Sequence, residues 1–240
     1  MSEQPAPLIK TTTGYRDRPD SRGRDLDNGF RFEAIAYMRI CIVNPSFRPD
    51  GNFVYPYVYA VSGATERRPE VVRFNGIAIG ARWPAEGLIV ATEPSNHDLG
   101  DFPEFASAGC LVMSARAYAV LSNILEPCGE ILPLVTTDGT ELFLLNPLPY
   151  FDSIDMVRSW GPRGRDGRLI DITKHEFVRE RIPTVAVFKS KYSWSTIFSI
   201  EDRYGWEESL QSLVELHGLK GLTFHEVWND VQGGIPREYR

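Results

Sequence analysis

Residues 183–228, PTVAVFKSKYSWSTIFSIEDRYGWEESLQSLVELHGLKGLTFHEVW, carry the clearest succession of secondary-structure signals in the chain. Two apolar, β-prone runs come first and predict a pair of strands. An acidic stretch then precedes a segment in which Trp206, Leu210 and Leu213 recur at helical spacing, and Gly218 follows as a helix stop. The end of the stretch alternates again and predicts a last strand. This order indicates a mixed fold, and no catalytic motif interrupts it.

The residues before this stretch predict a longer helix and a hairpin. Ser114 is placed to cap a helix that runs to about Leu125, with apolar residues along one face. Strands at 131–136 and 141–146 follow, joined around Asp138-Gly139, which is a strong hairpin signal. A short helix is also expected at 173–179.

The first half of the chain is richer in strands than in helices. Candidate strands are residues 34–43, 53–61, 71–79 and 87–91, and Pro56 restricts the second to a sheet edge or a broken strand. The predicted fold class is therefore α+β, with mixed or mostly antiparallel sheets, a few short helices and a strand-rich N-terminal half. We expect three segments: a mobile N-terminal arm at 1–28, a strand-rich region at 29–109 and an α+β domain at 110–240.

The bulk properties are those of a soluble globular protein. The 240 residues carry a net charge of -6, which argues against nucleic acid as the main partner and suits a basic protein partner. The three cysteines, Cys41, Cys110 and Cys128, form no metal-binding spacing and are expected to be reduced thiols in the cytoplasm. The start of the chain lacks a signal-peptide core, and no apolar run reaches the length that spans a bilayer.

Enzyme signatures are missing from the sequence. No phosphate-loop, dinucleotide, nucleophile-elbow or zinc-protease motif occurs, and the four histidines are scattered. His217 sits at a predicted helix C-terminus, where a cation interacts favourably with the helix dipole. His225 and Glu226 fall on a strand and point to opposite faces. We therefore expect no catalytic residues, no metal and no cofactor.

A glycine- and arginine-rich loop, GPRGRDGR at 161–168, is the best candidate for binding an anion. Its cationic side chains are Arg163, Arg165 and Arg168, and its glycines allow backbone amides to approach a ligand. The loop lacks the strand-then-helix context of a phosphate site, so a solvated, flexible loop is the competing interpretation. Trp160 just before it leaves a partner-contact role open.

Two further features are candidates for a protein interface. Tyr192 and Trp194 flank a predicted turn between strands, and large aromatics at such a tip are typical interface anchors; alternation would instead turn Trp194 into the core. The segment 93–109 is loop-like and acidic in its first part, with no basic residue to balance its acids, which are Glu93, Asp98, Asp101 and Glu104.

From about residue 110 onward, the sequence resembles a family of bacterial immunity proteins from polymorphic toxin systems, formerly catalogued as a domain of unknown function. The similar pieces occur in the same order and with similar spacing. They are LVMSARAYAVLSNIL, ILPLV, ELFLLNPL, FDSID, VAVFKS, STIFSI, WEESLQSLVEL and GLKGLTFHEVW. The resemblance covers about the last half of the chain, and these motifs are mostly structural.

The resemblance implies an antidote that binds one cognate toxin in the producing cell and blocks it sterically, with no shared catalytic residues. For the toxin contact we expect the acidic loop, through Glu93, Asp98, Asp101 and Glu104, helped by Tyr192 and Trp194. An enzyme or small-molecule binder that holds an anionic ligand through loop 161–168 stays open, as does a structural module of a larger assembly. A homodimer through an exposed sheet edge is also left open.

Overall fold

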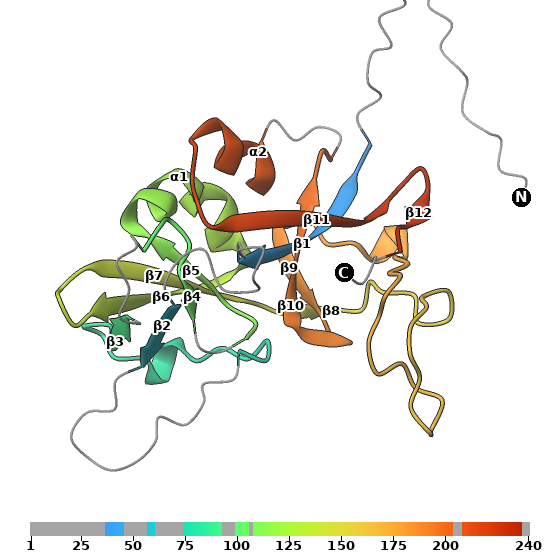
Figure 1. The fold of residues 1–240 in the computed structure, drawn as a ribbon, viewed down its shortest axis with the longest axis horizontal. Coiled ribbons are helices and arrows are strands. Elements are labelled where there is room, and N and C mark those ends of the chain that lie inside the picture. The colour runs from blue at the N-terminus through green and yellow to red at the C-terminus, as the bar shows by residue number, and fades with distance from the viewer. Residues whose placement is uncertain are drawn as a thin grey trace, which may run out of the picture. The chain divides into compact units, whose positions relative to one another are not determined.

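The computed structural model describes residues 37–45, 57–60, 74–92, 99–105, 108–203 and 208–236. These residues form two six-stranded sheets, shown in Figure 1, with two α-helices in the described part of the chain, α1 (Ala115–Leu125) and α2 (Leu210–Leu216). Short 3-10 turns occur at η1 (Gly80–Arg82), η2 (Glu126–Cys128) and η3 (Arg179–Arg181). The predicted α+β class, with few short helices and a strand-rich first half, is confirmed.

The first sheet combines strands from both ends of the described chain. Its order is β12 (Gly233–Gly234), β11 (Leu222–Asn229), β1 (Arg39–Pro45), β10 (Ser193–Glu201), β9 (Val187–Ser190) and β8 (Tyr150–Phe151). All neighbours are antiparallel except β8 and β9. The early strand β1 lies between two late ones, so the predicted division at 109/110 does not separate the sheets.

The second sheet is mixed in direction. Its order is β4 (Glu104–Phe105), β2 (Tyr57–Ala60), β3 (Leu88–Thr92), β6 (Gly129–Thr136), β7 (Glu141–Pro147) and β5 (Leu111–Ser114). The β2–β4 and β3–β6 pairs are parallel and the others antiparallel. The predicted hairpin is confirmed as β6–β7, which turns where Gly139 adopts a φ of 89°.

Helix α1 forms where capping and periodicity place it. The Ser114 side chain accepts a hydrogen bond from the Ala117 backbone N–H at 3.1 Å, which satisfies one of the unpaired amides of the first turn. Ala117, Leu121 and Leu125 are buried on one face. This face joins residues of both sheets and of α2 in one apolar cluster, so α1 helps to pack the two sheets together.

Both faces of the first sheet are buried. Along β1, Ile40 and Ile42 enter one apolar cluster, and Val43 enters another on the opposite side. In β10, Phe198 and Ile197 divide between the same two clusters. One face therefore packs against the helices and the second sheet, and the other lies under the connection between β8 and β9.

Two predicted elements are wrong in the described residues. Residues 74–79 form bends and irregular chain instead of a strand, and 173–178 are non-helical, with the 3-10 turn η3 beginning only at Arg179. The second segment is held by isolated bridges, in which Lys174 pairs with Trp160 and Phe177 pairs with Ile154. Tertiary pairing overrides its local helix signal. The C-terminal helix is confirmed as α2, and its predicted stop Gly218 has a φ of 57°.

Candidate functional site

Between β8 and β9 the chain forms a long, irregular hairpin at residues 153–178, which we call the side hairpin (Figure 1, yellow to orange). Its two limbs run antiparallel through bridges between Ile154 and Phe177, between Trp160 and Lys174, and between Arg163 and Leu169. Ile154, Ile172 and Phe177 are buried against the first sheet. The base of the side hairpin is therefore anchored in the core, which positions its outer end.

The outer end of the side hairpin is a closed turn. The Gly164 N–H donates to the Arg168 carbonyl at 2.8 Å, and the Gly167 N–H donates to the Gly164 carbonyl at 3.0 Å. The Asp166 carboxylate accepts from the Arg168 backbone N–H at 3.1 Å, and Gly167 takes a φ of 75°, which suits glycine. The loop is thus a hydrogen-bonded hairpin turn, and most of its residues are exposed to solvent, as the competing interpretation expects.

The three arginines of this turn are all exposed, but they point to different surroundings. Arg163 Nη1 donates to the Gly167 carbonyl at 2.8 Å, and Arg168 Nε lies 3.7 Å from a carboxylate oxygen of Asp166. Arg163 and Arg168 line a cavity between this turn and β10, and Arg165 is not part of its lining. The turn therefore offers two cationic groups to the cavity and one to solvent.

The β9–β10 turn, Ser190–Ser193, faces the side hairpin across this cavity. Tyr192 is 43% exposed and Trp194 48% exposed, so of the two orientations left open for Trp194 the structure has the outward one. Lys191 Nζ lies 2.6 Å from the Asp152 carboxylate and 4.9 Å from the Tyr192 ring centroid. This ion pair raises the pKa of Lys191 and lowers that of Asp152, and it ties the turn to the end of β8.

A bulge in β10 explains why Trp194 is not covered. Ser193 pairs with Ser190 of β9, and the next pair is Phe198 with Phe188. Between these two pairs β10 has more residues than β9, so the extra residues of β10 leave the ladder. On the other side, the ladder with β1 ends at Ile197. Residues 194–196 therefore stand outside both ladders, and they line the cavity.

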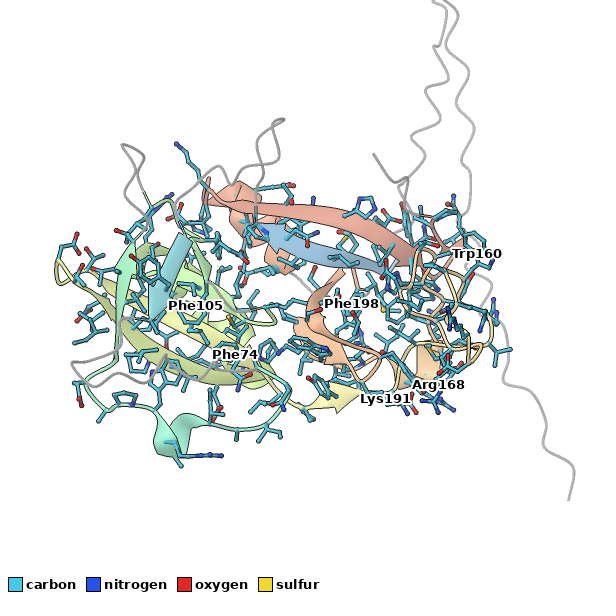
Figure 2. All side chains as sticks on the ribbon, turned by 60° about the horizontal axis from the view of Figure 1, so that its bottom comes forward. Phe74, Phe105, Trp160, Arg168, Lys191 and Phe198 are labelled. Atoms are coloured by element: carbon cyan, nitrogen blue, oxygen red, sulfur yellow. The ribbon has the colours of Figure 1, made fainter. Side chains whose placement is uncertain are left out.

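The hairpin cavity, as we call it, has a volume of about 690 Å³. The side hairpin supplies Arg163, Arg168, Ile170 and His175, and β10 and its turn supply Tyr192 and Trp194, among others. Figure 2 labels Trp160 and Arg168 on the side hairpin and Lys191 on the β9–β10 turn. This volume lies within the usual range for ligand pockets of roughly 300–1,000 Å³. Two sequence-predicted candidates, the arginine loop and the aromatic turn, thus meet at one site.

The inner end of the cavity is apolar and aromatic. His175 is buried, and its ring packs edge-on against Phe198 with centroids 5.5 Å apart. Met156 and Ile172 join it in the lining. Sequence analysis did not select these residues, because they line the cavity only through the packing of the side hairpin on the first sheet.

The acidic loop does not form a described acidic surface. Glu93 and Asp98 lie outside the described residues. Asp101 is buried, and its carboxylate accepts from the Lys220 backbone N–H at 2.8 Å and pairs with Arg116 at 3.0 Å. It also accepts from the Ser114 hydroxyl at 3.1 Å. Asp101 therefore joins the start of α1 to the segment after α2, which is a structural role.

Glu104 is half-buried on the edge strand β4, so it differs from the exposed acid that we expected. Burial raises the pKa of its carboxyl to about 7. It lines a small cavity of about 30 Å³ beside Phe102 and Cys110. A carboxyl that is only about half ionised at neutral pH contributes less than an exposed acid to long-range steering of a partner.

Lys189 is a buried cation that sequence analysis missed. It is fully buried on β9, and its Nζ donates to the Phe74 carbonyl at 2.6 Å. Burial lowers the pKa of the ammonium to about 8, and Cys110 contributes in the opposite direction. In the run VAVFKS this lysine is one of two polar residues at the end of an apolar strand, so no local signal marks its burial.

The described cysteines are free thiols with raised pKa values. Burial raises the pKa of Cys41 to about 12, and it raises the pKa of Cys110 and Cys128 as well. A nucleophilic cysteine needs the opposite shift. Among the described residues, no three His, Cys, Asp or Glu side chains gather closely enough to hold a metal ion. Neither α-helix in the described ranges has the length and apolar character to cross a membrane.

Comparisons with known proteins assign no family to the chain. No family model matches the sequence, and no curated protein matches it.

Proposed function

We propose that this protein is an immunity protein that binds one cognate bacterial toxin and blocks it sterically, with the hairpin cavity and the β9–β10 turn as its contact surface. One observation carries the proposal: the exposed aromatic turn at Tyr192 and Trp194 meets the arginines Arg163 and Arg168 around a single cavity. Trp, Tyr and Arg are the residue types that dominate binding energy in protein interfaces.

The surroundings of the cavity support a protein partner. Val157, Trp160 and Ile170 are large apolar side chains of the side hairpin that remain exposed, next to the cationic turn. An interface core of apolar and aromatic groups with a polar rim is typical of specific complexes. The base of the side hairpin is buried in the core, so this surface is held in place before binding, which lowers the entropy cost of association.

The proposal places the protein in the cytoplasm of the producing cell, where its free cysteines stay reduced. Steric blocking requires no reaction by this chain. It requires that the bound protein cover the active surface of the toxin with a long residence time. The net charge of -6 would speed the capture of a basic toxin.

A second candidate is the binding of a small anionic ligand in the hairpin cavity. The cavity volume of about 690 Å³ and the presence of Arg163 and Arg168 in its lining favour this reading. The two proposed functions differ in the occupant of the cavity in cells, which is a protein for the first and a small anionic metabolite for the second.

Co-expression tests the proposed function. Cells that express the product of the adjacent gene should survive only when this chain is present, and the two proteins should co-purify. The double variant Tyr192→Ala/Trp194→Ala should weaken the complex by at least about thirtyfold, which corresponds to roughly 2 kcal/mol for hot-spot residues. Ile89→Ala, which alters an exposed apolar residue on β3 of the other sheet, is the matched control and should bind normally. A wild-type chain that neither rescues nor co-purifies contradicts the proposal.

A further inference from the structure

We propose that the hairpin cavity receives an acidic, partly apolar peptide segment of the partner, held by Arg163 and Arg168. This inference rests on the proposed function and specifies the chemistry of its contact. It also revises the expectation that the acidic loop makes the main contact with a basic toxin, because the described acids of that loop are buried or half-buried.

The charge of the cavity favours a carboxylate ligand. Arg163 uses one N–H of its guanidinium in the bond to Gly167, and Arg168 makes only a long contact of 3.7 Å with Asp166. Most of their donors therefore remain for a ligand, and an arginine fork matches a carboxylate in two parallel hydrogen bonds. The cavity also contains one carboxylate, Asp171, whose Oδ1 accepts from the Ile172 N–H at 2.8 Å.

The remaining lining favours a peptide over a simple anion. Met156, Leu169, Ile170 and Trp194 present apolar surface to the same cavity that holds the arginines. A ligand that fills it must bring apolar groups together with negative charge. A segment that mixes acidic and apolar side chains has both, and an inorganic anion has only the charge.

The bulge of β10 adds a place for such a segment. Residues 194–196 stand outside the ladders with β9 and β1, and Ser195 and Thr196 line the cavity, where the Thr196 hydroxyl is hydrogen-bonded to that of Ser193. Hydroxyl groups donate to carboxylate and carbonyl oxygens alike. An extended segment can thus contact this edge of β10 while its acidic side chains reach the arginines.

The overall charge of the protein does not oppose this assignment. The net charge of -6 acts on an approaching partner at distances up to about a Debye length, roughly 8–10 Å, where it attracts a partner of net positive charge. Contacts inside the cavity act over a few ångströms, where the nearby arginines dominate. A basic toxin that carries one acidic segment satisfies both conditions.

The test uses the full chain and a fluorescein-labelled peptide of alternating glutamate and leucine, with an alternating lysine and leucine peptide as the charge control. Fluorescence polarisation should show binding of the first peptide only. R163Q/R168Q should weaken it by at least about tenfold. R165Q is the matched control, because Arg165 belongs to the same turn but not to the cavity lining, and it should change affinity less than about twofold. R168Q alone, which leaves the Arg163–Gly167 bond intact, should weaken binding by about threefold or more.

Three results would overturn the inference: equal affinity of R163Q/R168Q and R165Q, equal binding of the lysine peptide, or full displacement of the peptide by inorganic phosphate. The last result would mark a site for small anions instead. The outcome is separable from that of the proposed function. If wild type neutralises the toxin and R163Q/R168Q does so equally, only the inference fails. If no toxin is neutralised but the acidic peptide still binds in an arginine-dependent way, only the proposed function fails.

Discussion

Replacing Lys189 by methionine is expected to change how the stability of the fold depends on pH. The lysine is fully buried on β9 of the first sheet, and its Nζ donates at 2.6 Å to the carbonyl of Phe74, which belongs to the apolar cluster of the second sheet. Burial lowers the pKa of this ammonium from 10.5 to about 8, with an opposing contribution from Cys110. The fold therefore carries a cation that its surroundings disfavour.

The sign of the effect follows from proton binding. In the unfolded chain the lysine keeps its proton up to a pH near 10.5, whereas in the folded chain it releases the proton near pH 8. Between these values the unfolded state binds more protons, so the free energy of unfolding rises with pH. The gap corresponds to about 3 kcal/mol of stability, which is gained as the pH rises from about 8 to 10.5.

The methionine variant separates the charge from the packing. Methionine keeps an unbranched apolar stem but leaves the Phe74 carbonyl without its donor, at a cost of about 1–3 kcal/mol. At neutral pH this loss and the relief of the buried charge offset each other, so we expect a stability within about 2 kcal/mol of wild type. The contribution of Lys189 to the pH dependence should disappear, because the group that titrates is gone.

Guanidinium unfolding, followed by tryptophan fluorescence from neutral pH to about 10.5, measures the effect. Lys191→Met is the control, because this neighbouring lysine is exposed and pairs with Asp152, and its variant should retain the wild-type pH profile. Wild type and Lys189→Met contain the same other titratable groups, so the difference between their two pH profiles reports on Lys189. If wild type and Lys189→Met gain stability in parallel over this range, the lysine does not hold a lowered pKa and the reasoning is wrong.

Three further substitutions test other contacts. In wild type, Glu104 should lower the stability as the pH rises from 4.5 to about 7, because the folded carboxyl keeps a proton that the unfolded one has lost. Glu104→Gln should abolish this fall. Urea unfolding at several pH values tests it, and an unchanged dependence of stability on pH would contradict it. Gly161→Ala places a Cβ 2.2 Å from the Asp171 carbonyl oxygen, so the side hairpin must shift. We expect the free energy of unfolding to fall by about 1–3 kcal/mol and the acidic peptide to bind more weakly. A variant that binds the peptide normally would refute the clash. Asp101→Ala removes the ion pair with Arg116 and the acceptor of the Lys220 N–H. Calorimetry should show that the free energy of unfolding falls by about 2–4 kcal/mol. A decrease below about 1 kcal/mol would exclude the structural role.

The sequence correctly predicts the elements that are determined by their own residues, such as a helix with its cap or a hairpin with its turn. Helix α1 begins at its cap Ser114 and buries Ala117, Leu121 and Leu125 at helical spacing, so the residues alone define it. The β6–β7 hairpin forms around Asp138-Gly139 for a similar reason, because the turn residues adopt the required backbone angles.

The failed predictions concern segments that are shaped by distant partners. Residues 173–179 have the composition of a short helix, but Lys174 bridges to both Trp160 and Pro236 and is drawn into an extended conformation. The sequence does not decide whether the Trp194 side chain points outward or into the core. Period-two alternation holds only for a regular strand, and the bulge between Ser193 and Phe198 interrupts it. Such events depend on strand register, which the sequence of one segment does not contain.

The candidate site was predicted in its parts but not as a whole. Loop 161–168 and the turn at Tyr192 and Trp194 were each selected from residue type, as candidates for different functions. Their meeting depends on how the side hairpin folds back on the first sheet, where Ile172 and Phe177 pack beside Phe198. That packing joins residues far apart in the chain, so no spacing rule connects them.

The position of the site follows from how the first sheet is buried. One of its faces packs against α1, α2 and the second sheet, and the other lies beneath the side hairpin. With both faces covered, the strand ends of this sheet are among the parts that a partner can reach, and the β9–β10 turn is one of them. Trp194, Ile170 and Val157 stay exposed around that end, although burying each such side chain would stabilise the chain by roughly 1.5–3 kcal/mol. The described residues leave this apolar surface uncovered beside the exposed arginines, and under the proposed function a bound partner would bury it.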